Sequence, residues 1–102
     1  MNKTASYEMT IIVPVYNEED NIGSLEKRLG DYLKKAVRKS CVLFVNDGSK
    51  DKSLALIKEV CRRHPDFFYV SLGKNSGLSA AMKAGRDEAE SEYIGYIDAD
   101  LQ

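Results

Sequence analysis

The chain has 102 residues, which is enough for one small domain and too few for a second. Its 15 lysines and arginines nearly balance its 16 aspartates and glutamates, and the net charge of −1 excludes the basic surface typical of proteins that bind nucleic acid or anionic membranes. The apolar runs near residues 9–16 and 41–45 are too short to span a membrane and the first residues are polar, so we expect a soluble, cytoplasmic polypeptide.

The first part of the chain predicts a leader, a strand and a helix. Residues 1–8 are polar without periodicity, so we expect a loose leader before a domain that covers residues 9–102. Residues 9–16 are rich in β-branched side chains and favour a strand covered on both faces. Asn17 is expected to cap the next helix, with the acidic residues 18–20 in its first turn. The buried face of this helix is predicted to contain Ile22, Leu25, Leu29, Tyr32, Leu33 and Ala36.

The rest of the chain continues the alternation of strands and helices. Residues 41–45 predict a central strand followed by the polar turn 46–51, and a helix is expected over about 51–63 with a cap from Ser49 or Asp51. Residues 67–72 predict a third strand, and the polar turn 73–77 opens a third helix. Residues 93–98 predict a fourth strand. The inner face of the third helix is predicted to be mostly small, with Leu78, Ala81, Met82, Gly85 and Ala89.

This alternation predicts an α/β fold with a Rossmann-like parallel sheet of about four strands and right-handed crossovers. We expect the strand order 3-2-1-4, with helices on both faces of the sheet. Open sheets of this kind bind ligands beyond the carboxyl ends of their strands, next to a switch in strand order. With the expected order, the switch lies between the first and fourth strands, and it brings Asp98 and Asp100 beside the turn from Pro14 to Glu18.

The stretch from residue 93 to residue 102 predicts a cation site. Residues two apart in an extended chain face the same side, so Asp98 and Asp100 can present their carboxylates together, with Gln102 next in the row. Two carboxylates this close repel each other unless a proton or a metal intervenes, and an all-oxygen set suits Mg²⁺ or Mn²⁺ better than Zn²⁺. The alternative is a strand that simply ends in an acidic turn.

The turns after the second and third strands hold further candidates. Asp47 can accept a hydrogen bond from a ribose hydroxyl or a base N–H, or it can bond its own backbone as a turn residue. Residues 75–77 lead into a helix whose free N–H groups could meet an anion, with charge added by Lys74 or Lys83. A solvated helix face is the alternative for Lys83. The sequence contains neither a P-loop nor a dinucleotide-binding fingerprint.

Four turn motifs in one order resemble those of the inverting family 2 glycosyltransferases. They are V-P-V-Y-N-E-E at 13–19, N-D-G-S-K-D at 46–51, K-N-S-G-L-S-A-A at 74–81 and D-A-D-L-Q at 98–102. The resemblance covers nearly the whole chain after residue 8, and it is closest to the dolichyl-phosphate mannosyltransferase-like group, whose members glycosylate a polyprenyl phosphate. The chain departs from the usual pair of aspartates by having Asn46 before Asp47, which puts in doubt any role that needs a charge at residue 46.

The resemblance implies a GT-A fold that binds a UDP- or GDP-linked sugar, with the D-x-D motif holding Mg²⁺ or Mn²⁺ against the diphosphate. It also implies roles for individual positions. By motif position, the nucleoside pocket would be lined by Pro14, Tyr16, Asn17 and Glu18, and Asp47 would contact the base or ribose with support from Asp51. The residues along the nucleotide cleft would be Asn75, Gly77 and Lys83. The metal site would be formed by Asp98, Asp100 and Gln102.

Family domains continue past the D-x-D motif into the part that binds the acceptor and, where one is used, carries the general base. We therefore expect this chain to be the N-terminal, donor-binding half of an enzyme, inactive alone and prone to self-association through its last strand. The whole enzyme is expected to act on an acceptor such as a lipid phosphate, at the cytoplasmic face of a membrane. A non-catalytic nucleotide- or metal-binding module is the alternative function. Receiver domains and phosphohydrolases are disfavoured because they place their acidic motifs after other strands.

Overall fold

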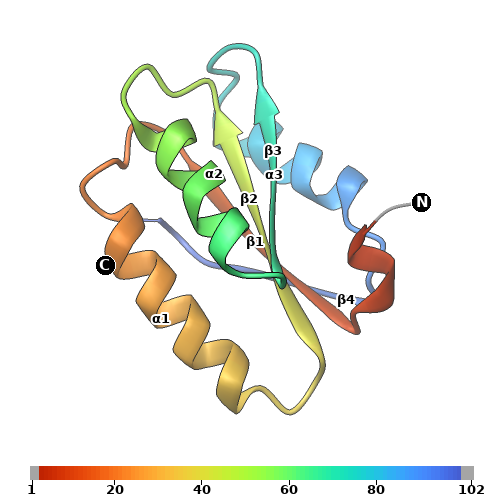
Figure 1. Ribbon diagram of the computed structural model, residues 1–102. Coiled ribbons are helices and arrows are strands. Elements are labelled where there is room, and N and C mark those ends of the chain that lie inside the picture. The colour runs from red at the N-terminus through yellow and green to blue at the C-terminus, as the bar shows by residue number, and fades with distance from the viewer. Residues whose placement is uncertain (1–2, 100–102) are drawn as a thin grey trace.

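The computed structural model describes residues 3–99, which form one sheet with helices on both faces (Figure 1). The strands are parallel in the order β3-β2-β1-β4, so the expected fold class and strand order are confirmed. In chain order the elements are η1 (Lys3–Ser6), β1 (Met9–Val15), α1 (Ile22–Lys35), β2 (Ser40–Asp47), α2 (Ser53–Arg63), β3 (Phe67–Leu72), α3 (Leu78–Glu88) and β4 (Tyr93–Tyr96).

Strands β1 and β2 form the buried centre of the sheet. Every residue of β2 is buried, and β1 is buried apart from its first residue and Pro14. Their unbroken apolar runs are what a strand needs when helices cover both of its faces. The pairing register aligns Val15 with Asn46, and Asp47 with Leu72. The carboxyl ends of β1, β2 and β3 therefore lie at one edge of the sheet.

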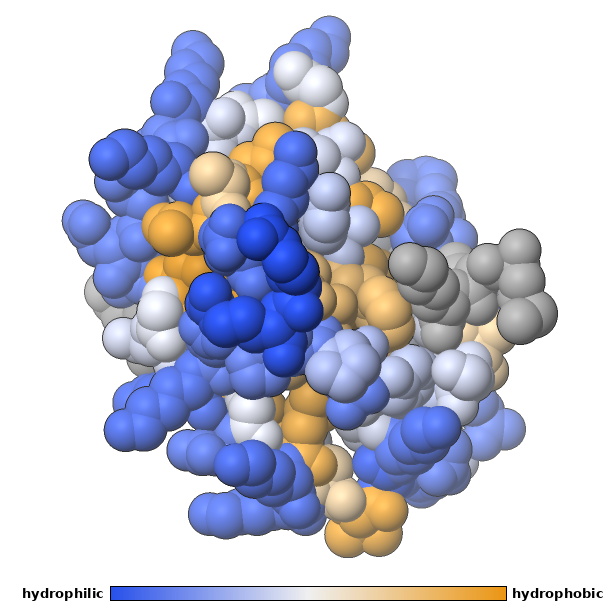
Figure 2. Space-filling view, in the orientation of Figure 1, coloured by the Kyte–Doolittle hydropathy of each residue, from blue (hydrophilic) through white to orange (hydrophobic). Residues whose placement is uncertain are grey.

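The helices are divided between the two faces of the sheet (Figure 1). On one face α1 and α2 pack on alternate strand residues such as Val13 and Phe44, and on the other face α3 packs on Ile12 and Val45. Helix α3 lies so close to the sheet that a Cβ on Gly85 would be 2.7 Å from a methyl carbon of Ile12. The expected close approach of a small-residue helix is therefore confirmed. On the face of α1 and α2, Figure 2 shows mostly hydrophilic residues with hydrophobic ones between them.

The start of α1 differs from the prediction. Asn17 does not cap the helix: it has a φ of 52° and lies in a loop, and α1 begins only at Ile22. The acidic residues 18–20 consequently precede the helix, and no acidic residue lies in its first turn. Tyr32, expected on the buried face, is 45% exposed. The backbone N–H groups of residues 17–19 donate to side chains of the loop after β2 and of the first residue of α2, so this segment is part of a contact between loops.

The expected loose leader is also incorrect for the residues that the structure describes. Residues 3–6 form the short helix η1, and Thr4 is only 2% exposed. The Glu90 backbone N–H donates to Thr4 Oγ1 at 2.9 Å, and the Ser91 hydroxyl donates to the Thr4 carbonyl at 2.9 Å. The Tyr7 hydroxyl donates to the Asp66 carboxylate. These bonds join the segment to the loop before β4 and to the start of β3.

Strand β4 is shorter than expected and ends at Tyr96. Within the described part of the chain it pairs with β1 only. Its side chains are unusually open for an apolar strand, since Tyr93, Ile94 and Tyr96 are 41%, 37% and 41% exposed. Leu78 at the start of α3 was expected on the inner face and is 59% exposed. No helix among residues 3–99 is both long and apolar enough to cross a membrane.

Candidate functional site

A cleft of about 320 Å³ lies at the carboxyl ends of the strands, where the sequence analysis predicts the ligand site. Turns from four different parts of the chain contribute to it, because parallel strands deliver their carboxyl ends to one edge. Its lining contains most of the predicted site residues together with apolar residues that the sequence did not single out. The lining consists of Pro14, Val15, Tyr16, Glu18, Asp47, Asn75, Gly77, Leu78, Ala81, Asp98 and Ala99.

Asp47 holds the wall of the cleft formed by residues 75–77. Its Oδ1 accepts from the Ser76 N–H at 2.8 Å, and its Oδ2 accepts from the Gly77 N–H at 2.9 Å and from Asn75 Nδ2 at 3.0 Å. Asp47 is 4% exposed, and its carboxylate faces the positive end of α3, where negative charge is favourable. Asp47 therefore bonds the neighbouring turn and not its own backbone, while it still lines the cleft.

Two glycines permit this arrangement. Gly48 has a φ of 69°, and a Cβ there would lie 2.3 Å from the backbone nitrogen of Asn75, so the two turns could not approach each other with a larger residue. Gly77 has a φ of 97° with a ψ of 161°, a backbone conformation that is essentially restricted to glycine. The turns of the cleft are thus shaped by backbone conformation as well as by side chains.

Asn46 connects β2 with its neighbours and carries no charge. Its amide donates from Nδ2 to Ser71 Oγ at 3.0 Å, while its Oδ1 accepts from the Ser49 N–H at 3.3 Å. An ionised aspartate could accept from the Ser71 hydroxyl and from the Ser49 N–H, but it would bury a second negative charge next to Asp47. The neutral amide of asparagine makes both bonds without that charge, at a position that is 2% exposed.

Three of the predicted site residues within 3–99 do not line the cleft. Asn17 and Asp51 instead join the loop after β1 to the loop after β2: the Lys50 N–H donates to Asn17 Oδ1 at 2.8 Å, and the Glu19 N–H donates to Asp51 Oδ2 at 3.2 Å. Burial alone would raise the pKa of Asp51, but hydrogen bonds from Ser53 and Glu19 outweigh it and lower that pKa. Lys83 is exposed on α3 and pairs with Asp87 at 2.8 Å, as expected for a solvated helix face.

Asp98 is the one residue of the predicted metal site that the structure describes, since Asp100 and Gln102 lie outside the described residues. It is exposed and lines the cleft just beyond β4. Among residues 3–99 no three His, Cys, Asp or Glu side chains gather as a metal site would require. An exposed carboxylate at this edge fits an oxygen-ligated cation such as Mg²⁺ or Mn²⁺, with the remaining ligands from elsewhere.

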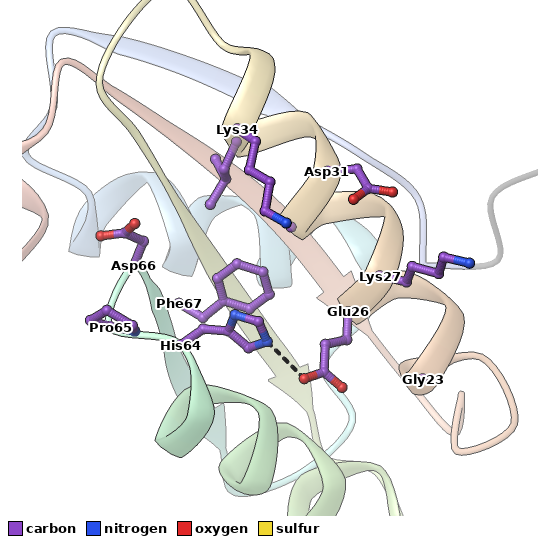
Figure 3. Close-up of a pocket in the computed structure, with 11 residues that line it drawn as sticks. Gly23, Glu26, Lys27, Asp31, Lys34, His64, Pro65, Asp66 and Phe67 are labelled. Carbon is purple, nitrogen blue, oxygen red and sulfur yellow. Dashed lines mark hydrogen bonds and ion pairs between the residues drawn. The ribbon is translucent and has the colours of Figure 1, made fainter.

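Two other cavities differ from the cleft in place or in chemistry. One of about 710 Å³ lies over the ends of β2 and β3 and shares Tyr16 and Asn75 with the cleft. The other, of about 540 Å³, lies between α1 and the start of β3 (Figure 3). There Glu26 points to His64, with 2.7 Å between Oε2 and Nε2, and Phe67 stacks on the imidazole. The cavity beside Glu26 is larger than the cleft, but it lies away from the carboxyl ends of the strands, and Glu26 is already paired with His64.

The comparisons with known proteins agree with this arrangement. The model of glycosyl transferase family 2 matches residues 10–102. The uncharacterized glycosyltransferase sll0501 of Synechocystis is 39% identical over 95 residues, which cover 93% of this chain and 30% of that protein. The dodecaprenyl-phosphate galacturonate synthase of Rhizobium johnstonii is 35% identical over 98 residues, which cover 95% of this chain and 29% of that protein.

A solved structure is similar over the same region. The mannosyltransferase of Pyrobaculum calidifontis, in complex with GDP-Man and Mn²⁺, matches with a TM-score of 0.76 and 27% identity over 92% of this chain and 28% of that one. The chain thus spans less than a third of the length of each of these relatives. The expected Rossmann-like GT-A architecture is confirmed by this match and by the strand order. Because the family model matches almost the whole chain after residue 9, the chain belongs to glycosyl transferase family 2.

Proposed function

We propose that this chain binds the donor of a glycosyltransferase that moves a sugar from a nucleoside diphosphate to a polyprenyl phosphate. The observation that carries the proposal is the convergence of the family's turn motifs on one cleft, with Tyr16, Asp47 and Asp98 in its lining. The mannosyltransferase similar to this chain has GDP-Man and Mn²⁺ bound, which supports a nucleotide sugar and a divalent cation as ligands.

The cleft offers different chemistry to the two ends of such a donor. Near β1 and β2, Tyr16 provides an aromatic ring and Asp47 a carboxylate edge for the nucleoside, which we propose to be UDP- or GDP-linked. Near β4, Asp98 would hold Mg²⁺ or Mn²⁺ together with Asp100 and Gln102. Bound there, the cation would neutralise charge on the diphosphate leaving group. The chain's own contribution is to orient the donor along the cleft and to keep its sugar carbon accessible to the acceptor.

A lipid phosphate is the acceptor that we propose for the whole enzyme. The similarity to a dodecaprenyl-phosphate galacturonate synthase supports this class. A phosphate oxygen is ionised at neutral pH, so attack on the sugar with inversion needs no general base, and positioning provides most of the catalysis. The enzyme would then work at the cytoplasmic face of the membrane that holds the lipid.

Titration of the 102-residue chain with UDP and GDP, each with and without Mn²⁺, tests the donor site. We expect binding at or below the millimolar range that tightens when the cation is added, and NMR shifts in the lining of the cleft. A folded chain that binds neither nucleotide with the cation present would refute the proposal. A binding module without catalysis is the second candidate, and turnover of a nucleotide sugar by the complete protein with polyprenyl phosphate would exclude it.

A further inference from the structure

The loop between β1 and α1 forms one wall of the cleft and has no regular secondary structure of its own. Tyr16 and Glu18 line the cleft, and Asn17 between them has a φ of 52°, in the left-handed region that non-glycine residues seldom adopt. The helix that follows begins only at Ile22. Whatever holds this loop in place therefore also determines the shape of that wall.

Ser53 is the buried anchor of this loop. It is the first residue of α2 and 0% exposed, and its Oγ accepts from the Glu18 backbone N–H at 2.8 Å. Behind it, Asp51 Oδ1 accepts from the Ser53 N–H at 2.8 Å, and Asp51 Oδ2 accepts from the Glu19 N–H at 3.2 Å. Two consecutive N–H groups of the loop after β1 are thus bound by two side chains of one turn after β2.

The other bonds between these loops lie at the surface. The Asn17 N–H donates to Ser49 Oγ at 3.0 Å, and the Lys52 N–H donates to Glu19 Oε1 at 3.4 Å, both in exposed positions. Water can replace an exposed partner at little cost, whereas Ser53 is fully buried and its bond to the Glu18 N–H is partly buried, so water is less able to take the place of this acceptor. Of these contacts, the one made by Ser53 is consequently the hardest to replace.

We propose that Ser53 is a positioning residue for donor binding, because its bond to the Glu18 N–H fixes the backbone that presents Tyr16 and Glu18 to the nucleoside. This inference rests on the proposed function, which gives the wall its ligand. A serine at the start of a helix ordinarily indicates a cap for that helix, whereas Ser53 binds the neighbouring loop. That is why local sequence reasoning passes over it.

Replacement of Ser53 by alanine tests the role in binding. We expect the Kd of UDP or GDP with Mn²⁺ to rise about tenfold in S53A, which corresponds to ~1.4 kcal/mol. Ser40→Ala is the matched control, since Ser40 is 7% exposed and donates to the Arg38 carbonyl at 2.9 Å from the opposite end of β2. The control is expected to lose thermal stability without a change in Kd. Equal Kd values for S53A and S40A would overturn the proposal.

Amide hydrogen exchange separates this inference from the proposed function. The Glu18 amide is expected to exchange at least about tenfold faster in S53A, while the Ile57 amide inside α2 keeps its rate. Unchanged exchange at Glu18 would overturn the role of Ser53 alone. A wild-type chain that binds neither nucleotide would overturn the proposed function, with the Glu18 result still deciding whether Ser53 holds the loop. If S53A does not fold, Asp51→Asn is the second variant, with an expected rise of about threefold in Kd and faster exchange at Glu19. An unchanged Kd together with unchanged exchange at Glu19 in this variant would overturn the proposal.

Discussion

Asp47 shows how one side chain serves both the architecture and the cleft. Its two oxygens accept three hydrogen bonds from residues 75–77, and Asp47 also lines the cleft. A carboxylate has about four acceptor positions, so one remains for a ligand. We infer that Asp47 orders the turn before α3 and, from the same position, meets the nucleoside.

We predict different effects for changes at the two ends of the cleft. Asp47→Ala is expected to weaken the binding of nucleoside about tenfold or more, even without metal, because the turn at 75–77 loses its acceptors. Asp100→Asn is expected to weaken only the metal-assisted binding of nucleoside diphosphate, because it removes a charge from the proposed cation site. Calorimetry with nucleoside and nucleoside diphosphate, with and without Mn²⁺, measures both effects.

Asp47→Asn serves as the control for folding in this comparison, since its amide keeps one acceptor oxygen for the turn. Its affinity for nucleoside is expected to lie between that of the wild type and that of Asp47→Ala. Equal losses for nucleoside and nucleoside diphosphate in the Asp47 and Asp100 variants would show that the two carboxylates do not divide the ligand in this way.

At the scale of elements, Glu26 connects α1 to the end of α2. The Arg63 guanidinium donates to both oxygens of Glu26, at 2.8 and 2.9 Å, and His64 Nε2 lies 2.7 Å from one of them (Figure 3). The hydrogen bond from Arg63 is the largest influence on the pKa of Glu26 and lowers it against a smaller effect of burial. The helices α1 and α2 are therefore joined by a charge-assisted contact on one face of the sheet.

Glu26→Gln is expected to lower the free energy of unfolding by about 1 kcal/mol at neutral pH, because it replaces a charge-assisted contact that is partly open to solvent. The pKa of Glu26 is lowered in the folded state, so the ionised carboxylate stabilises the fold above its ordinary value of 4.5. That stability disappears as the pH falls through the lowered pKa. Urea unfolding at a series of pH values from 7 to 3 should show that the free energies of unfolding of the wild type and of Glu26→Gln become equal towards pH 3.

The matched control for Glu26 is Glu59, which is 50% exposed and pairs with arginines of its own helix. Glu59→Gln should change stability by less than about 0.5 kcal/mol. A difference between wild type and Glu26→Gln that stayed the same at pH 3 and pH 7 would contradict the assigned role of the carboxylate.

At the scale of the whole molecule, β4 is the open side of the sheet in the described part of the chain. The Tyr93 N–H and the Ile97 N–H donate to carbonyls of the segment that contains β1. Alternate residues of a parallel strand direct their backbone groups to opposite sides, so those of Ile94 and Tyr96 face away from β1. Together with the exposed side chains of β4, these groups form an edge suited to pairing with another strand.

We predict that the 102-residue chain alone self-associates through β4 and transfers no sugar. Ultracentrifugation should show concentration-dependent dimers or larger species, and Ile94→Lys should reduce them because charge on an edge strand opposes pairing. Leu56→Lys is the control, since Leu56 is 36% exposed and belongs to α2, which packs on β2 and β3. A stable monomer that transfers sugar from a nucleotide donor to polyprenyl phosphate would refute both parts of the prediction.

Much of this architecture was accessible from the sequence by itself. The third strand was predicted with its observed bounds, Phe67–Leu72, and the strand order and the grouping of the turns at one edge were also predicted. The bounds of a strand depend on hydrophobic periodicity and on turn residues, which are local along the chain, whereas the strand order was expected from the general topology of doubly wound sheets. Of the cleft residues, Asp47 was indicated by its place at the end of a buried strand, whereas Tyr16 was expected only from the resemblance to family 2 glycosyltransferases.

Only the tertiary structure decided which polar groups bond to each other. Asn17 and Ser53 both have the chemistry of helix caps, yet each bonds the neighbouring loop, across more than 30 positions of sequence. Thr4 is buried by partners 86 and 87 positions away. A local pattern contains no information on such distant partners, because buried donors and acceptors pair with whatever the completed fold places beside them.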